Sequence, residues 1–306
     1  MDKNYFSKTR ILDGGMGQEL MARGLKAKGS LWSATALLDE KHHQLIIDTH
    51  LDFIYAGADV IVTNTFGARK IRLIQNNCGQ HFEYANVKAA ELAVKAKELS
   101  KKNILIAGSL PAQNNTYQAD LGENLDLIEK NFYDQAKLIK PYIDFFYLDV
   151  LCSGKECEIA LRSIRKFNLP VLVGLHIRKD GRLPSGERIN EIVKKYKDDN
   201  WLGVITACVA PEFVENVIEE LKQLNLPFGF KINAWEKIPE NFKISDWTKG
   251  YGKDGNPNIV LGSRKDITED KFYEFVKKFK DAGATILGGC CEIRPSHINK
   301  IANLKN

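Results

Sequence analysis

The chain has 306 residues and a formal net charge of +5, from 44 Lys and Arg against 39 Asp and Glu. This small excess is spread along helix-like stretches beside acids, which is typical of solvated helix faces and argues against a nucleic-acid-binding protein. No apolar run reaches the roughly 18 residues of a membrane span, and residues 1–15 lack the apolar core of a secretory signal, so we expect a cytoplasmic protein with no membrane partner.

Short apolar runs rich in β-branched residues recur along the whole chain. Each run is almost continuously apolar, which is typical of parallel strands that are covered on both faces. We predict eight strands, at residues 10–15, 59–66, 103–110, 144–150, 169–177, 202–208, 226–233 and 284–290.

Charged stretches with helical spacing separate these strands, for example residues 39–57, 83–100 and 210–225. In the last of them Pro211 fits a helix start. Eight strand-then-helix units predict a single (β/α)₈ TIM barrel over residues 1–306, with a doubly wound open sheet as the alternative. The irregular stretch 235–267 carries glycines, prolines and two tryptophans, and a loop of this length is usually functional or interfacial.

In such a barrel the C-terminal ends of the strands share one face, and chemistry is found there. Polar and sulfur-containing residues gather at those predicted ends. They are Asp13, Asn64, Ser109, Asp149, His176, Cys208, Asn233 and Cys290 with Cys291.

The cysteines at two of these ends indicate a metal site. Cys208 ends the sixth predicted strand and Cys290 and Cys291 end the eighth, so their strands are second neighbours around the barrel. Thiolates select zinc among common cellular metals, and three protein ligands with an open position are typical of a catalytic zinc site. Buried packing and a vicinal disulfide between Cys290 and Cys291 remain alternatives. No metal pattern includes the other cysteines, Cys78, Cys152 and Cys157.

The charge of such a centre favours one kind of chemistry. Zinc with three thiolates is formally −1 and is therefore a poor acid for making hydroxide. A thiol that enters the open position still loses its proton, and its sulfur stays electron-rich enough to attack a methyl carbon. This argues for thiol alkylation over the alternatives, a zinc hydrolase or deaminase and a structural or redox-sensing barrel.

Four stretches resemble the homocysteine S-methyltransferase family: "ILDGGMGQEL" (11–20), "VTNTF" (62–66), "GVITACVAPE" (203–212) and "ILGGCCEIRPSHI" (286–298). The resemblance implies a (β/α)₈ barrel and an enzyme that methylates homocysteine to methionine. It implies Zn²⁺ as the cofactor and homocysteine and a methyl donor as small-molecule partners. The sequence does not fix the oligomeric state, and a homo-oligomer remains an alternative. The implied zinc ligands are Cys208, Cys290 and Cys291, and the implied substrate-binding residues include Asp13, Gly14, Gly15 and Asn64.

The sequence departs from the family pattern at several places. Ala207 stands where an asparagine is usual, and residues 108–120 replace a glycine-rich loop. Residues 231–236, "KINAWE", replace a Tyr-Pro-Asn element but keep Asn233. Asp149 occupies the position of a glutamate that binds the substrate ammonium, so we expect it to take that role, with a helix N-cap as the alternative.

Two features bear on the methyl donor. The stretch "SLWSA" (30–34) is similar to the branch that uses S-methylmethionine, whereas "DGG" (13–15) is similar to the betaine branch. We favour a sulfonium donor of the S-methylmethionine type, with glycine betaine or a dimethylsulfonio compound as the alternative. An onium methyl donor is held well by aromatic faces, and Trp32, followed by Trp235, is the expected one.

Overall fold

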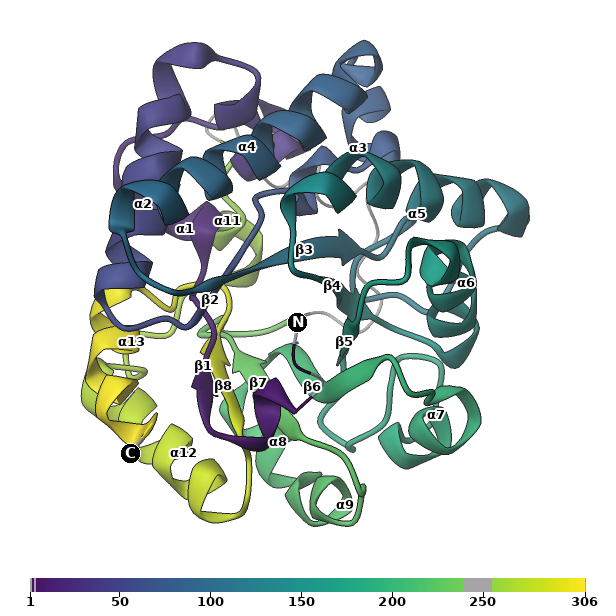
Figure 1. Cartoon of the computed structure of the whole chain (residues 1–306), viewed down its shortest axis with the longest axis vertical. Coiled ribbons are helices and arrows are strands. Elements are labelled where there is room, and N and C mark those ends of the chain that lie inside the picture. The colour runs from purple at the N-terminus through teal and green to yellow at the C-terminus, as the bar shows by residue number, and fades with distance from the viewer. Residues whose placement is uncertain (1, 3, 239–254, 306) are drawn as a thin grey trace.

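A computed structural model of the chain describes residues 2, 4–238 and 255–305. In these ranges eight parallel strands form one sheet in the order β1-β8-β7-β6-β5-β4-β3-β2 (Figure 1). A parallel bridge between Leu12 and Val60 joins the two ends of this order, so the sheet closes into a barrel. The strands are β1 (Arg10–Ile11), β2 (Val60–Val62), β3 (Leu105–Pro111), β4 (Phe145–Leu151), β5 (Val171–Leu175), β6 (Trp201–Val209), β7 (Phe228–Ile232) and β8 (Ile286–Gly289).

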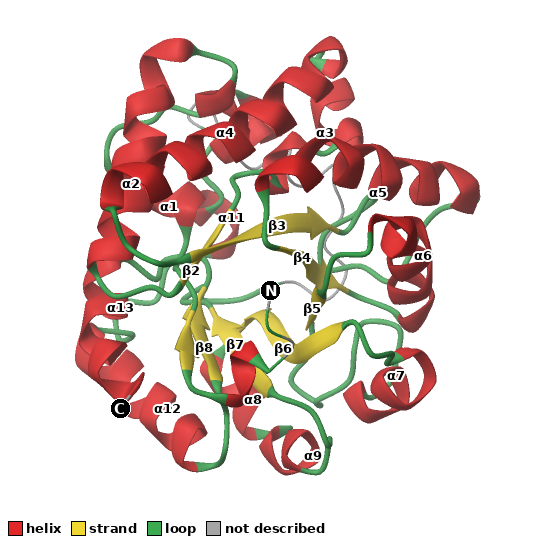
Figure 2. Ribbon diagram, in the orientation of Figure 1, coloured by secondary structure: helices red, strands yellow, loops and turns green. Residues whose placement is uncertain are grey.

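Helices surround the strands on the outside, which confirms the predicted (β/α)₈ TIM barrel (Figure 2). The α-helices are α1 (Met16–Ala22), α2 (His43–Tyr55), α3 (Lys70–Gln75), α4 (Phe82–Ser100), α5 (Leu125–Ile139), α6 (Gly154–Ile164), α7 (Ile189–Tyr196), α8 (Pro211–Glu215), α9 (Ile218–Lys222), α11 (Asn258–Leu261), α12 (Glu269–Asp281) and α13 (Pro295–Ile301). Short 3₁₀ helices are η1 (Tyr5–Ser7), η2 (Gly29–Leu37), η3 (Glu40–His42), η4 (Phe66–Ala68), η5 (Gly79–His81), η6 (Lys140–Tyr142), η7 (Arg165–Phe167) and η8 (Ala302–Lys305).

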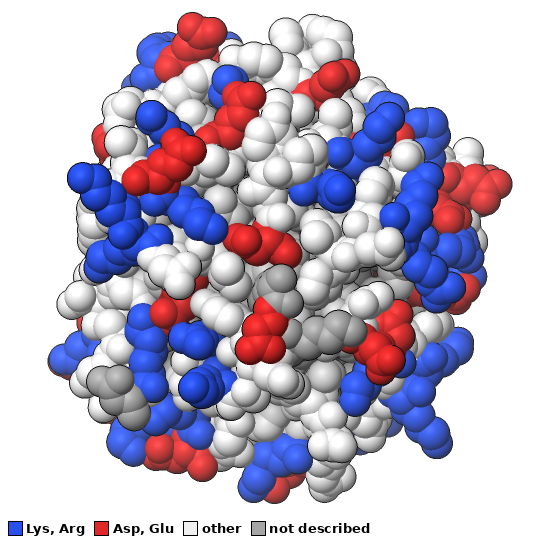
Figure 3. Space-filling model, viewed as in Figure 1, with Lys and Arg blue, Asp and Glu red and all other residues white. Residues whose placement is uncertain are grey.

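Local sequence explains where several helices begin and which face they bury. The side chains of Asn124, Ser153 and Thr268 accept hydrogen bonds from backbone N–H groups in the first turns of α5, α6 and α12. Helix α12 buries its apolar residues at helical spacing and leaves its lysines outside. Figure 3 shows such basic side chains intermixed with acidic ones over one face of the molecule.

The predicted strands differ from the observed ones mainly in length. Strand β1 covers only two residues of the run 10–15, and β2 covers three residues of the run 59–66. Both runs continue as loops at the C-terminal end of the barrel, and these loops line the cavity described below. The predicted helical stretch 210–225 divides into α8 and α9 around a turn at residues 216–217.

The long stretch 235–267 is described at its two ends, and residues 239–254 lie outside the described residues. The two ends run side by side. The backbone N–H of Glu236 donates to Leu261 at 3.1 Å, and that of Arg264 donates to Ala234 at 2.9 Å. Both ends reach the C-terminal face of the barrel. None of the helices in the described ranges combines the length and apolarity needed to cross a membrane.

The interior of the barrel is apolar towards the N-terminal ends of its strands. Phe6 of η1 is fully buried and packs edge-on against Phe145 of β4, with ring centroids 5.9 Å apart. The two rings belong to a cluster of buried residues with Leu12, Val60, Ala107, Tyr147, Leu172, Leu202, Ile205 and Ile286. The N-terminal segment therefore supplies part of the core that keeps the barrel closed.

This packing predicts the effect of removing the ring of Phe6. The Phe6→Ala variant should lose about 3–5 kcal/mol of unfolding free energy, because the ring leaves a cavity against Phe145 that the strands cannot fill. Urea denaturation of the wild type and the variant measures this change. Leu127→Ala, which removes a side chain that is 47% exposed, should change stability by less than about 0.5 kcal/mol. Equal losses in the two variants would contradict the role of Phe6.

Candidate active site

A cavity opens at the C-terminal ends of the barrel strands, where the sequence places its candidate residues. It contains all the predicted metal ligands and substrate-binding residues. Its lining includes Asp13, Gly14, Gly15, Trp32, Asn64, Phe66, Ser109, Tyr117, Asp149, Cys208, Lys231, Trp235, Cys290 and Cys291. Two other strand-end residues, His176 and Asn233, line a neighbouring cavity instead, and Tyr117 and Trp235 border both spaces.

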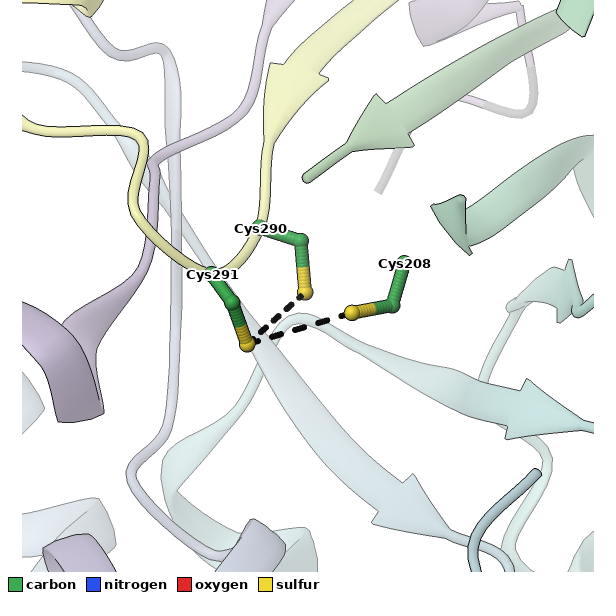
Figure 4. Close-up of side chains that lie close together, drawn as sticks. All are labelled: Cys208, Cys290 and Cys291. Atoms are coloured by element: carbon green, nitrogen blue, oxygen red, sulfur yellow. Dashed lines mark hydrogen bonds between the residues drawn. The ribbon is translucent and has the colours of Figure 1, made fainter. Parts of the chain in front are cut away.

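The three predicted ligand thiols turn towards one another (Figure 4). The Sγ atom of Cys291 lies 3.8 Å from that of Cys208 and 3.9 Å from that of Cys290, and all three sulfurs lie within 4.8 Å of one another. All are free thiols, since these distances exceed the roughly 2.05 Å of a disulfide. Three thiolates bound at about 2.3 Å to one tetrahedral ion stand about 3.8 Å apart, so the donor set fits a metal ion.

Irregularities in the strands turn two of the site's side chains inward. The register of β6 against β7 shifts between Ala207 and Val209, and Cys208 between them has φ +53°. The register of β4 against β5 shifts after Leu148, next to Asp149, and Val150 has φ +64°. Such bulges re-aim side chains, and a left-handed backbone at a non-glycine residue is strained and concentrates at functional sites.

Two polar side chains contact the sulfur of Cys208. The hydroxyl of Tyr117 lies 3.3 Å from it, and the Nδ2 atom of Asn233 lies 3.5 Å away and also donates to the backbone carbonyl of Cys208 at 2.7 Å. Burial raises the pKa of the Cys208 thiol, but hydrogen bonding with Cys290, Cys291, Tyr117 and Asn233 outweighs burial and holds that pKa well below its usual range. Contact with Cys208 raises the pKa values of the other two thiols, so the cluster without a cation favours one thiolate.

Glycines let the first-strand loop lie directly against the cysteine loop. A Cβ atom at Gly14 would stand 2.3 Å from the carbonyl oxygen of Ile293, and one at Gly15 would stand 2.5 Å from that of Cys290. Real Cβ contacts do not approach this closely, so any side chain there would force the two loops apart. The glycines therefore keep the backbone of the β1 loop at the edge of the cavity, next to the thiols.

A buried ion pair lines the cavity. The Nζ atom of Lys231 lies 2.6 Å from Oδ1 of Asp13, and Oδ2 of Asp13 accepts from the backbone N–H of Val62 at 2.7 Å. Burial lowers the pKa of Lys231, but the acidic groups of Asp13, Cys290 and Asp149 raise it above its ordinary value, so the ammonium stays charged. Burial raises the pKa of Asp13, against the opposing effect of that ammonium.

Asp149 is the second carboxylate of the cavity. Its Oδ2 atom accepts a hydrogen bond from the hydroxyl of Ser109 at 2.9 Å. Burial raises its pKa to about 6, although the charge of Lys231 and the hydroxyl of Ser109 act in the opposite direction. The alternative in which Asp149 caps a helix is wrong, because Asp149 lies inside β4 and Ser153 caps α6.

Aromatic rings form another part of the cavity wall. Trp32 is half-buried, has φ +50° and meets Phe66 edge-on at 6.1 Å, and its indole N–H donates to Gln18 at 2.8 Å. The ring also lies over Gly17, where a Cβ atom would stand 2.3 Å from it. Trp235 is 3% exposed, and its indole N–H has no hydrogen-bond partner among the described residues.

The remaining cysteines and the strand-end histidine lie outside the thiol cluster. Cys152 and Cys157 are fully buried, and Cys78 is half-buried in its loop. The Nδ1 atom of His176 lies 3.2 Å from the carbonyl oxygen of Ala207, and its ring contacts Tyr117 with centroids 4.8 Å apart. Burial lowers the pKa of His176, so the ring is neutral at pH 7.

Sequence reasoning missed several residues of the cavity, among them Lys231, Phe66 and Tyr117. Lys231 carried a usable signal, because it is a charged residue inside the apolar run 226–233. Phe66 ends the "VTNTF" stretch and could have been included with Asn64. Tyr117 carried no such signal, because it lies in an irregular loop whose path depends on contacts remote in sequence.

The closed barrel and the three thiols that face its cavity define a (β/α)₈ barrel with a candidate metal centre. A family model described as homocysteine S-methyltransferase matches residues 10–304. The chain therefore belongs to the homocysteine S-methyltransferase family and is a methyltransferase, as the sequence resemblance predicted.

Individual relatives agree with this assignment. The chain is 26% identical to homocysteine S-methyltransferase 1 of Arabidopsis thaliana, over 95% of this chain and 92% of that protein. It is 23% identical to selenocysteine methyltransferase of Astragalus bisulcatus, over 96% of this chain and 91% of that protein. The metallated form of the homocysteine methyltransferase MmuM from Escherichia coli matches with a TM-score of 0.78 and 20% identity, over 99% of this chain and 100% of that one, and shares the fold.

The thiol geometry predicts the outcome of removing one ligand. Cys290→Ala should weaken the binding of a thiophilic divalent ion by more than the roughly 10–100-fold that loss of an outer partner causes, because it leaves two thiolates. Titration with Co²⁺, followed by thiolate-to-metal charge-transfer absorption, measures the affinity. Cys157→Ala removes a buried thiol outside the cluster and should bind Co²⁺ as the wild type does. Unchanged affinity in Cys290→Ala would exclude the three-thiol site.

Proposed function

We propose that the chain catalyses the zinc-dependent transfer of a methyl group from a sulfonium donor to the thiol of L-homocysteine, giving methionine. The observation that carries this proposal is the arrangement of the cavity. Three sulfurs, the charged side chains of Asp13, Lys231 and Asp149, and the aromatic rings of Trp32 and Phe66 line one cavity. An amino acid with a thiol and a cationic methyl donor require these three features together.

The donor set supports zinc as the metal. Thiolates are soft ligands that suit zinc, and three protein ligands leave a fourth position for a substrate. Zinc held there would lower the pKa of the substrate thiol and keep its sulfur nucleophilic at neutral pH. Hydrogen bonding from Tyr117 and Asn233 to Cys208 would stabilise the thiolate form of that ligand.

The side chains around the cavity then orient the acceptor. Asp149 binds the ammonium group of homocysteine, and Asp13, Gly14, Gly15 and Asn64 frame its amino acid end. The amino acid end is thereby fixed while the thiol points at the three cysteines. This positioning replaces a bimolecular encounter with a reaction between groups that are already aligned.

The charge of the methyl donor determines which side chains can bind it. A sulfonium or ammonium methyl donor carries a positive charge, and the faces of Trp32 and Trp235 attract a cation and exclude water. After the methyl group leaves, the rest of the donor is a neutral sulfide or amine. The reaction therefore needs no general acid, and none is assigned.

We favour a donor of the S-methylmethionine type, and glycine betaine or a dimethylsulfonio compound remains the alternative. Membership of a methyltransferase family argues against the hydrolase and deaminase alternatives. A cytoplasmic location remains a prediction from the sequence, which leaves the oligomeric state open.

The raised pKa of Asp149 predicts how acceptor binding depends on pH. The carboxylate binds the ammonium group only when it is ionised, so KM for homocysteine should rise as the pH falls through about 6. Asp149→Asn should weaken homocysteine binding by roughly 1.5–3 kcal/mol and remove this pH dependence. Steady-state kinetics between pH 5 and 8, with metal content checked at each pH, measure both effects. The role fails if the variant keeps wild-type affinity, or keeps the wild-type pH profile.

The aromatic wall predicts the effect of replacing Trp32. Trp32→Ala should raise KM for S-methylmethionine roughly tenfold, because a desolvated cation–π contact contributes about 1–2 kcal/mol, while the dissociation constant of homocysteine stays unchanged. Trp201→Phe alters a buried tryptophan at the start of β6, at the opposite end of the barrel, and serves as the control. Turnover with betaine and none with S-methylmethionine would refute the sulfonium donor and leave the methyltransferase assignment intact.

A further inference from the structure

One charged side chain of the cavity has no role in the steps described so far. Lys231 lies inside β7, is 5% exposed and is the cavity's only cationic side chain among the residues that the structure describes. A lysine is almost never buried to this extent unless it is paired. Its partner is Asp13, 2.6 Å away, and that pair spans β7 and the loop after β1.

The strands on both sides of Lys231 leave space for its side chain. The register places it beside Ala207 of β6, whose side chain is a methyl group, and Gly288 of β8, which has no side chain. A Cβ atom at Gly288 would stand 2.8 Å from Cβ of Leu12, so a larger residue there would have to displace β1. The ammonium group therefore reaches across β8 to Asp13 along the floor of the cavity.

The other ionisable groups around the cavity are acidic. Asp13, Asp149 and the thiol cluster all carry negative charge when ionised, and a carboxylate entering their midst would be repelled. The ammonium group has three N–H donors. Two of them face Asp13, through Oδ1 and through the backbone carbonyl oxygen at 3.4 Å. Within the described ranges the third donor has no partner and is open to a ligand.

We propose that Lys231 binds the carboxylate of the acceptor, so that Lys231 and Asp149 together select a zwitterionic amino acid. The proposal rests on the function inferred above and specifies which group of the acceptor each charge recognises. Lys231 of β7 and Asp149 of β4 line the same cavity, and their opposite charges would fix the two ends of an α-amino acid in one orientation. A thiol without a carboxylate would lose the contact with Lys231 only.

Two truncated acceptors separate this role from a structural one. The acceptor 4-sulfanylbutanoate lacks the ammonium group of homocysteine, and 3-aminopropane-1-thiol lacks its carboxylate. Dissociation constants for both compounds and for homocysteine are measured by titration calorimetry on the metal-loaded protein, alongside kcat and KM for homocysteine. Lys231→Met should weaken homocysteine and 4-sulfanylbutanoate binding roughly 10–100-fold and leave 3-aminopropane-1-thiol unchanged. Asp149→Asn should give the reverse pattern for the two truncated acceptors.

Matched variants guard against a loss of structure. Lys305→Met removes a lysine that likewise contacts one carboxylate, that of Asp59 at 2.9 Å, and one backbone carbonyl, and it should bind all three thiols normally. The double variant Lys231→Met with Asp13→Asn removes the buried pair as a whole, so no unpaired carboxylate remains, and it should keep the loss of 4-sulfanylbutanoate binding that Lys231→Met shows.

The dissociation constants of the three thiols test the role of Lys231. Equal losses for both truncated acceptors, or unaltered binding of all three thiols in Lys231→Met, would overturn the role of Lys231 while wild-type turnover of homocysteine stands. Absence of homocysteine binding to the metal-loaded wild type would instead overturn the proposed function, and the role of Lys231 with it.

Discussion

Closure of the sheet is the constraint on which the site depends. The bridge between Leu12 and Val60 makes β1 and β2 neighbours, and the strand order then brings the ends of β6, β7, β8 and β1 together. Residues more than 80 positions apart, such as Cys208 and Cys291, reach 3.8 Å in this way. An open sheet with the same strands would leave those ends in a row, and its outer strands would contribute nothing to a shared centre.

The N-terminal end of the barrel contributes stability, and the C-terminal end holds the groups of the candidate active site. Phe6, Phe145 and their mostly apolar neighbours fill the N-terminal end of the barrel. The C-terminal end holds a buried ion pair, a carboxylate with a raised pKa and a thiol with a lowered one. Burying those groups costs free energy, and the apolar end of the same barrel offsets that cost.

The fold and the thiol cluster were accessible from the sequence because each rests on a strong local pattern. Eight apolar runs repeat at strand-helix spacing, and Cys208 and Cys290 end two of them. The loops were less accessible. Tyr117 reaches Cys208 because Arg69, from the turn before α3, donates to the hydroxyl of Thr116 in the same loop, a contact between residues 47 positions apart. No local pattern encodes such a contact. The same holds for the side chain of Lys231, which passes β8 to contact Asp13.

The contact between Gly17 and Trp32 has a consequence for how such a barrel could change its donor. Position 17 lies in α1 and has no part in the thiol cluster, yet the absence of a side chain there lets the indole lie where it does. Any larger residue would push the ring towards the cavity or out of its present position. Mutation of this helix residue can therefore move the ring of Trp32 and change the shape of the cavity beside it, while the three thiols are left unchanged.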